Sequence, residues 1–310
     1  MIFNAISKGL KRIILVTLTL LVLTTIIIGM IFYLVNKTNG RIESSGQVRS
    51  YLLYVPKTYQ STTPMPLVIS IHGFAEWPAH QMDISRWNEL ADVDGFMVVY
   101  PSGTGFPLRW NTHGPVGTAV DPMNEVLFIS DLIDKLEQEY NVDRTRIYAN
   151  GLSNGGGMSY LLACKLADRI AAIGSVSGAY LYPWDDCEPS RPVPLIAFHG
   201  THDPIVPYNG GGSSRFDNPF PVIPEWIDLW AQRNECDDHP IELPTTGEVS
   251  GKKYTKCKQN AEVVFYSIQG GGHAWPGGEP LPEIIVGHTT QDINATKEMW
   301  EFFKQHPMGH

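Results

Sequence analysis

Residues 146–158 read RIYANGLSNGGGM, and this stretch decides the fold. It begins with a short apolar run at 147–149 that is typical of a buried strand, and it leads into a helical pattern of apolar residues from Met158 onward. The pentapeptide GLSNG at 151–155 lies at the junction. A serine between two glycines at such a junction predicts a sharp turn that exposes a nucleophilic hydroxyl, here that of Ser153. A glycine-rich loop with an incidental serine is the alternative, and the flanking strand and helix disfavour it.

Short apolar runs alternate with helical patterns along the rest of the chain. Those at 67–71 and 96–100 are apolar at nearly every position, as in strands that are covered on both faces. Residues 125–140 repeat apolar side chains at helical spacing, with an acidic opposite face. This alternation predicts an α/β fold with a doubly wound, mostly parallel sheet in one domain. Further strands are expected at 50–55, 146–149, 171–176, 195–198 and 262–268, further helices at 153–166, 219–234 and 294–304, and an irregular excursion at 237–259.

The N-terminal region differs from the rest of the chain. Residues 13–35 carry no charge and consist almost wholly of Ile, Leu, Val, Thr and Met. At about 1.5 Å per residue, a helix of this length crosses the roughly 30 Å hydrocarbon core of a bilayer. With basic residues before the run, we expect a short cytoplasmic N-terminus at 1–12, a transmembrane signal anchor at 13–35, a linker at 36–46 and an external folded domain at 47–310. A cleaved signal peptide, which would release a secreted protein, is the alternative.

The charge of the chain limits its partners. The formal net charge is −9, and the sequence contains no stripe of Lys and Arg. An acidic chain without a basic surface argues against binding to nucleic acid. The membrane is the expected partner, through the N-terminal helix.

Four cysteines follow the apolar N-terminal run. None of them forms a C-x-x-C pair, which disfavours a zinc site, and no metal or organic cofactor is expected. An even number in an exported chain predicts two disulfides, for which three pairings are possible. Pairing neighbours in the sequence closes the shortest loops, each of about 20 residues. The cysteines are Cys164, Cys187, Cys236 and Cys257.

A serine hydroxyl attacks only when a base removes its proton, so a histidine and an orienting acid are needed. In a fold of this kind the acid and then the histidine follow the serine, each in a loop after a strand. Asp203 follows the strand at 195–198, and His273 follows the strand at 262–268. These positions predict Asp203 as the acid and His273 as the base of a catalytic triad with Ser153. The rivals are His199, His202, His288, His306 and His310 for the base, and Asp185, Asp186 and Asp217 for the acid.

Acyl transfer also needs backbone donors for the oxyanion of the tetrahedral intermediate. One is expected to be the amide of Asn154, directly after the serine, and the other the amide of Phe74, after the strand at 67–71. The alternative for the second site is a simple strand-ending turn. His72, Trp110 and Trp275 are expected to bind substrate, although packing in the core is the commoner fate of a tryptophan.

Five segments carry a family resemblance: IHG at 71–73, YANGLSNGGGM at 148–158, HGTHDPIVPY at 199–208, GGGHAWPGG at 270–278 and the closing helix at 295–307. Together they resemble the polyhydroxybutyrate depolymerase-like and feruloyl-esterase-like branch of the α/β-hydrolases, over residues 51–307. The resemblance implies an α/β-hydrolase fold and a serine esterase with an acyl-serine intermediate and the triad and amides named above. It also implies sequential disulfides, and as substrates short hydroxyacyl esters such as hydroxybutyrate oligomers, or feruloyl and acetyl esters.

Two departures from that branch shape the expected substrate. The N-terminus resembles an anchor instead of a cleavable signal, and the sequence has no appended polymer-binding domain, so soluble oligomers or aromatic esters are expected in place of solid polyester. A peptidase of the prolyl-oligopeptidase kind shares the order Ser, Asp, His, but it needs a gating domain for which this chain has no room. A non-catalytic binding module on the same fold is disfavoured because all three triad positions are filled.

Overall fold

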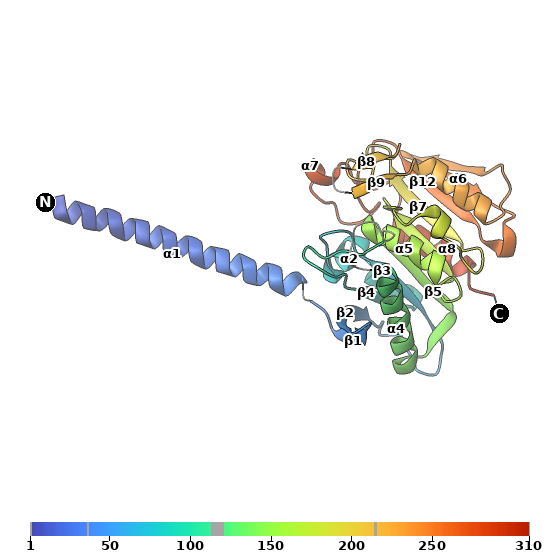
Figure 1. Ribbon diagram of the computed structural model, residues 1–310, viewed down its shortest axis with the longest axis horizontal. Coiled ribbons are helices and arrows are strands. Elements are labelled where there is room, and N and C mark those ends of the chain that lie inside the picture. Colours follow the sequence, from blue (N-terminus) through green and yellow to red (C-terminus); the bar gives the residue numbers. More distant parts are fainter. Residues whose placement is uncertain (1, 36, 113–120, 214–215, 310) are drawn as a thin grey trace. The chain divides into compact units, whose positions relative to one another are not determined.

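The computed structural model describes residues 2–35, 37–112, 121–213 and 216–309 (Figure 1). The chain divides into two units, Met1–Lys37 and Thr38–His310. The first unit contains the helix α1 (Ile2–Val35), whose segment Gly9–Met30 has a mean hydropathy of 2.7. By length and composition this segment can cross a membrane, but a signal sequence near an N-terminus meets the same criteria. The predicted anchor therefore stays a prediction.

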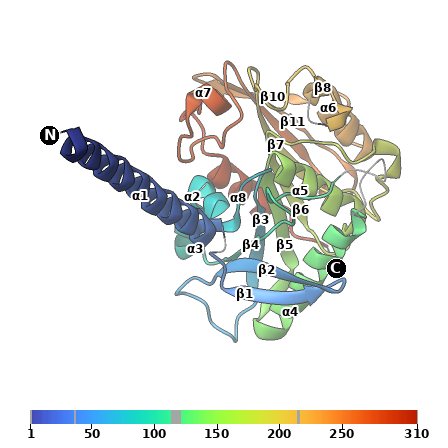
Figure 2. The ribbon, with the colours of Figure 1, turned by 60° about the vertical axis from the view of Figure 1, so that its left-hand side comes forward.

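Among the described residues, the second unit is built on a ten-stranded sheet with the order β1-β2-β4-β3-β5-β6-β7-β12-β11-β10 (Figure 2). In this order, the strands β4, β3, β5, β6, β7 and β12 each run parallel to the next. At one edge β4 pairs antiparallel with β2 and β2 with β1, and at the other edge β12 pairs antiparallel with β11 and β11 with β10. This arrangement confirms the predicted mostly parallel sheet. The strands are β1 (Gly40–Ser44), β2 (Gln47–Tyr54), β3 (Met65–Ile71), β4 (Met97–Pro101), β5 (Val142–Leu152), β6 (Ala172–Val176), β7 (Leu195–Gly200), β10 (Ile241–Thr246), β11 (Val249–Tyr254) and β12 (Val263–Ile268).

Helices cover both faces of the sheet, which explains why the central strands are apolar on both sides. Along β3, Leu67 and Ile69 pack into the core beneath α4, α5 and α6, whereas Val68 packs into the core beneath α2, α3 and α8. The helices are α2 (Pro78–Ser85), α3 (Trp87–Asp94), α4 (Met123–Glu139), α5 (Asn154–Lys165), α6 (Ile223–Arg233), α7 (Glu283–Val286) and α8 (Ala295–Gln305). The short strands β8 (Gly211–Ser213) and β9 (Phe216–Phe220) pair separately, and the single turns η1 (Trp184–Asp186) and η2 (Lys258–Asn260) complete the elements.

The two sheet edges differ from the expectation. The predicted linker at 36–46 includes β1, which pairs with β2 from Gly40↔Tyr51 to Ser44↔Gln47, so the sheet begins at Gly40. The predicted irregular excursion at 237–259 contains the hairpin β10–β11, which extends the sheet beyond β12. Five of the six β10 residues are exposed, so burial imposes no apolar alternation on this edge strand. The backbone pairing forms these edges with only a few apolar residues, such as Ile42 and Leu243, to mark them in the sequence.

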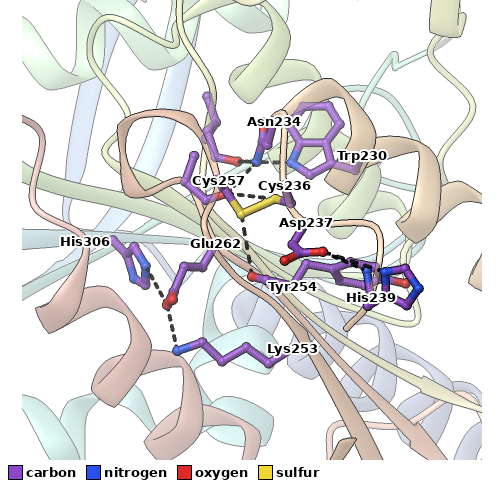
Figure 3. Close-up of a disulfide and its surroundings, with 12 residues drawn as sticks. Trp230, Asn234, Cys236, Asp237, His239, Lys253, Tyr254, Cys257, Glu262 and His306 are labelled. Carbon is purple, nitrogen blue, oxygen red and sulfur yellow. Dashed lines mark hydrogen bonds and ion pairs between the residues drawn. A yellow bond between two sulfur atoms is a disulfide. The ribbon is translucent and has the colours of Figure 1, made fainter. Parts of the chain in front are cut away.

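The cysteines form the disulfides Cys164–Cys187 and Cys236–Cys257, which is the sequential pairing that the resemblance implied. The second disulfide joins the segment after α6 to the segment after β11 (Figure 3). Beside it the buried amide of Asn234 donates to the carbonyl oxygens of Val193 at 2.8 Å and Ala261 at 2.9 Å. These contacts fix the end of α6 against the residues that precede β7 and β12.

Candidate active site

Ser153 lies between the end of β5 and the start of α5, as the sequence predicts. Its backbone has φ of 57° and ψ of −117°, a strained conformation for a residue with a side chain. Its amide donates to the carbonyl of Val176 at 2.8 Å, and its carbonyl accepts from the amides of Gly157 and Ala179, both at 3.0 Å. These three bonds tie the turn to the end of β6 and to the first turn of α5, so the strain is held by the surrounding backbone.

The glycines on either side of Ser153 are required by the packing of β3 against this turn. A Cβ on Gly155 would lie 2.1 Å from the carbonyl oxygen of Ile71, and one on Gly151 would lie 2.4 Å from the backbone of Gly155. No side chain fits at such distances. The G-x-S-x-G pattern therefore reflects direct backbone-to-backbone contact between the end of β3 and the serine turn.

Asp203 and His273 meet at the carboxyl ends of β7 and β12. The Nδ1 of His273 lies 2.7 Å from Oδ2 of Asp203, and Oδ1 of Asp203 accepts from the amides of Ile205 and Val206, each at 2.8 Å. Burial acts to raise the pKa of Asp203, but the charge and hydrogen bond of His273, together with His199, hold it below its usual range. The carboxylate stays ionised and directs the other imidazole nitrogen of His273 away from itself.

The three residues lie at the carboxyl ends of β5, β7 and β12, which are parallel strands close together in the strand order. Ser153 is 9 % exposed and His273 is 5 % exposed. Within the described residues the Ser153 hydroxyl has no hydrogen-bond partner in the structure. Such contacts are often long without substrate and tighten in the complex, so the catalytic role of the three stays a prediction.

The glycines before His273 accommodate neighbouring backbone. The amide of His273 donates to the carbonyl of Val286, and the amide of Gly272 donates to the carbonyl of His288 at 2.8 Å. A Cβ on Gly272 would lie 2.1 Å from the Val286 oxygen. The segment 286–288 therefore supports the histidine loop directly, a role that nothing in the sequence indicates apart from the glycines themselves.

The described rival residues make other contacts, although His199 also lies against the Asp203 carboxylate, with its Nε2 3.5 Å from Oδ2. His199 is buried, its Nε2 lies 2.9 Å from the carbonyl of Val206, and burial lowers its pKa. His288 is half-exposed and pairs with Glu248 at 2.8 Å. Asp185 and Asp186 lie in the exposed turn η1, and the side chain of Asp217 is outside the described residues.

The expected oxyanion donors are positioned by tight local contacts. Phe74 lies in a turn in which the next residue, Ala75, has a positive φ of 63°. The amides on both sides of Phe74 are bonded: Gly73 donates to Glu76 Oε2 at 2.7 Å, and Ala75 donates to the carbonyl of Leu108 at 2.8 Å. Among the described residues no acceptor bonds to the amide of Phe74 or of Asn154. Both amides are thus free to donate, but their joint action on an oxyanion stays a prediction.

His72 and Trp110 are both buried. The Nδ1 of His72 donates to the carbonyl of Gly73 at 2.7 Å, and its Nε2 accepts from the amide of Gly103 at 3.0 Å. Burial lowers the pKa of His72 to about 4, so the ring stays neutral in the one tautomer that makes both bonds. The indole of Trp110 donates to the carbonyl of His72, and its backbone exchanges two hydrogen bonds with the side chain of Asn154. These contacts favour a positioning role over direct substrate contact.

Trp275 is 2 % exposed, and its indole donates to Thr296 at 3.0 Å. Its burial agrees with the alternative of core packing. The described part of the chain contains no group of three or more His, Cys, Asp or Glu side chains arranged to hold a metal ion.

Comparison with known proteins finds relatives that are named esterases. The family described as "Esterase PHB depolymerase" matches residues 49–183. A bifunctional acetylxylan esterase/xylanase, XynS20E, from Neocallimastix patriciarum is 33% identical over 251 residues, covering 79% of this chain and 34% of that protein. Feruloyl esterase B from Piromyces equi is 31% identical, covering 74% of this chain and 44% of that protein. This chain therefore spans less than half the length of these two relatives.

Two further similarities cover most of both proteins. The probable feruloyl esterase C of Aspergillus niger is 28% identical, covering 86% of each chain. The structure of an acetyl xylan esterase from Aspergillus awamori superposes with a TM-score of 0.58 at 15% identity, covering 86% of this chain and 98% of that one, which shows a shared fold. The chain thus resembles the polyhydroxybutyrate depolymerase-like and feruloyl-esterase-like branch of the α/β-hydrolases, as its sequence motifs indicated.

Proposed function

We propose that the Thr38–His310 unit is a carboxylic ester hydrolase that acts through an acyl-Ser153 intermediate. The observation that carries the proposal is the 2.7 Å contact between His273 and Asp203. This pair lies at the carboxyl ends of the parallel strands, as does the strained turn of Ser153. A hydrogen-bonded imidazole–carboxylate pair and a strained serine, carried at the same ends of parallel strands, are the parts that acyl transfer to serine requires. The names of the relatives support the same class of reaction.

In the proposed mechanism, His273 removes the proton of Ser153 as the hydroxyl attacks the ester carbonyl. The tetrahedral oxyanion receives hydrogen bonds from the amides of Phe74 and Asn154. His273 then gives its proton to the leaving alcohol, and the acyl-serine forms. In the second half, His273 activates a water that releases the acid, while Asp203 stabilises the imidazolium in both halves.

The proposed substrates are feruloyl, acetyl and short hydroxyacyl esters. Feruloyl and acetylxylan esters are what the relatives are named for, and hydroxyacyl esters follow from the name of the matching family. We propose soluble oligomers or aromatic esters in place of solid polyester.

We further propose that α1 anchors the enzyme in a membrane, with residues 1–12 in the cytoplasm and the sheet-containing unit outside. The apolar segment Gly9–Met30 supports the anchor, and the two disulfides support an oxidising compartment. If the segment is instead cleaved, the same unit is secreted.

The test is a substrate panel on the full chain in detergent micelles. Short p-nitrophenyl esters, methyl ferulate, hydroxybutyrate oligomers and a peptide p-nitroanilide are assayed in parallel, each with Ser153→Ala as the control. We expect Ser153-dependent turnover of the esters and little turnover of the peptide. Faster cleavage of the peptide would replace the esterase with a peptidase, and an inert wild type would favour a binding module.

A further inference from the structure

The turn that carries Phe74 is closed by two reciprocal hydrogen bonds. The amide of Glu76 donates to the carbonyl of Gly73 at 3.3 Å, and Oε2 of Glu76 accepts from the amide of Gly73 at 2.7 Å. Phe74 and Ala75 are the two central residues of the turn, and a positive φ at the second central residue is the signature of a type II turn. In such a turn the amide of the first central residue has no partner inside the turn, which leaves the Phe74 amide free.

The Glu76 side chain is held in place on several sides. Its exposed fraction is 17 %, and its second oxygen lies 3.5 Å from Nδ1 of His80. A Cβ on Gly73 would lie 2.8 Å from Oε2, so the carboxylate packs tightly over this glycine. Burial acts to raise the pKa of Glu76, but His80, the Gly73 amide and His72 together lower it, so the carboxylate is ionised at neutral pH.

Neither the triad nor the oxyanion donors account for a mostly buried carboxylate at this position. A negative charge near a developing oxyanion opposes it, so the charge of Glu76 is no help to the reaction. What the carboxylate supplies is an acceptor of fixed position for Gly73. The Gly73 amide is thereby held in one orientation, and the Gly73 carbonyl is held by the amide of Glu76. Together these two bonds orient the peptide group between Gly73 and Phe74, which includes the Phe74 amide.

We propose that Glu76 is a positioning residue that holds the Phe74 amide toward the oxyanion through its hydrogen bond to Gly73. The inference rests on the proposed esterase function. It predicts that the reach of the side chain is required and that its negative charge is not. Glu76→Gln keeps an acceptor oxygen at the same reach without the charge, whereas Glu76→Asp keeps the charge and shortens the side chain by one methylene.

The experiment measures kcat and KM for p-nitrophenyl acetate with the full chain in detergent. Removal of one oxyanion donor lowers kcat by about 100- to 1,000-fold in known cases, so a displaced donor is expected to cost roughly 10- to 100-fold. We expect that loss in Glu76→Asp with KM within about threefold of the wild type, because an oxyanion donor acts in the transition state. Glu76→Gln is expected to stay within about threefold in both constants. The matched control is Glu89→Asp on α3, an exposed glutamate, which is expected to change neither constant.

A second background tests whether Glu76 acts through the amide of Phe74. Phe74→Pro removes that amide, and proline is well tolerated at the first central position of a type II turn. Phe74→Ala is the reference for the loss of the ring. When Glu76→Asp is added to Phe74→Pro, kcat is expected to fall by less than about twofold, because the amide that Glu76 positions is already absent. Where the proline variant does not fold, the glutamine and aspartate pair decides alone.

The outcomes separate this inference from the esterase proposal. Wild-type turnover and its loss in Ser153→Ala are measured first, and failure there rejects the proposed function. If that holds, the inference is overturned by an active Glu76→Asp, by a Glu76→Gln as impaired as the aspartate variant, by a raised KM with kcat unchanged, or by a full aspartate effect in the proline background.

Discussion

At the residue scale, the packing around Ser153 leaves little room for change. The carbonyl of Ile71 ends β3 directly against Gly155, and the strained backbone of Ser153 is held by bonds to β6 and α5. Strain at a reactive residue persists only when its surroundings fix it. The glycines are therefore structural requirements of the turn as well as a sequence signature.

We predict that Gly155→Ala destabilises the fold and abolishes ester hydrolysis. The added Cβ would lie 2.1 Å from the Ile71 carbonyl oxygen, and relieving such overlap typically costs about 1–3 kcal/mol of the free energy of unfolding. The check is urea denaturation followed by tryptophan fluorescence. The control is Gly212→Ala, where a Cβ would meet nothing within 4 Å. Equal stability of the two variants would contradict the packing account.

The sequence alone predicted the strand ends that carry the candidate site residues, but not how those residues are supported. The pairing of Asp203 and His273 was predictable because each residue follows a strand, and the carboxyl ends of neighbouring parallel strands lie together. His72 and Trp110 were expected to bind substrate, whereas the structure gives each a set of backbone contacts. The sequence did not single out Glu76, because its proposed role depends on the turn at 73–76. The one available indication was a polar residue three positions after Gly73.

At the element scale, the interior strands were predictable and the edge strands were not. β3 and β4 are buried on both faces, so their sequences are almost wholly apolar. β10 is exposed, and β1 alternates in burial but carries only one large apolar residue, Ile42, so backbone pairing decides these edges. Short edge strands carry little periodic signal because solvent covers much of each one.

The edge hairpin supplies a prediction about the second disulfide. Replacing Cys236 and Cys257 together with serine removes a cross-link with a sequence separation of 21 residues. A loop of this size is expected to contribute about 3 kcal/mol to the free energy of unfolding in the chain-entropy model. The disulfide ties α6 to the end of β11, away from Ser153, so kcat is expected to stay within about twofold. Denaturation under non-reducing conditions and ester turnover check both points; a large loss of kcat at unchanged stability would contradict them.

At the scale of the whole molecule, buried neutral histidines make the fold sensitive to acid. The unfolded chain takes up a proton at His72 near its ordinary pKa of 6.5, but the folded chain resists it until about 4. Stability therefore falls as the pH drops through this window, by roughly 3 kcal/mol from His72. The lowered pKa of buried His199 acts in the same direction.

This acid effect is measurable because all eight tryptophans lie between Trp77 and Trp300, in the sheet-containing unit. We predict that the midpoint of urea denaturation falls steadily from pH 7 to pH 4. A midpoint independent of pH over this range would mean that these histidines gain protons in the folded state as readily as in the unfolded chain.

The membrane anchor is the second prediction at this scale. If α1 spans a bilayer, the full chain expressed in cells stays with the membrane pellet after extraction with alkaline carbonate. Replacing Leu20 and Leu21 with arginine is expected to release it, because charged residues at the centre of a span cost roughly 2.5–3.5 kcal/mol each. Recovery of a shortened wild-type chain in the medium would show that the segment is a cleaved signal.

The central claim is that Ser153 is the nucleophile activated by His273, and trapping the covalent adduct tests it most directly. The full chain is treated with a fluorophosphonate and the modified peptide is identified by mass spectrometry. The account predicts one adduct, on Ser153, with labelling slowed by several orders of magnitude in His273→Ala and absent in Ser153→Ala. Labelling on another serine, or equally fast labelling of Ser153 without His273, would contradict it.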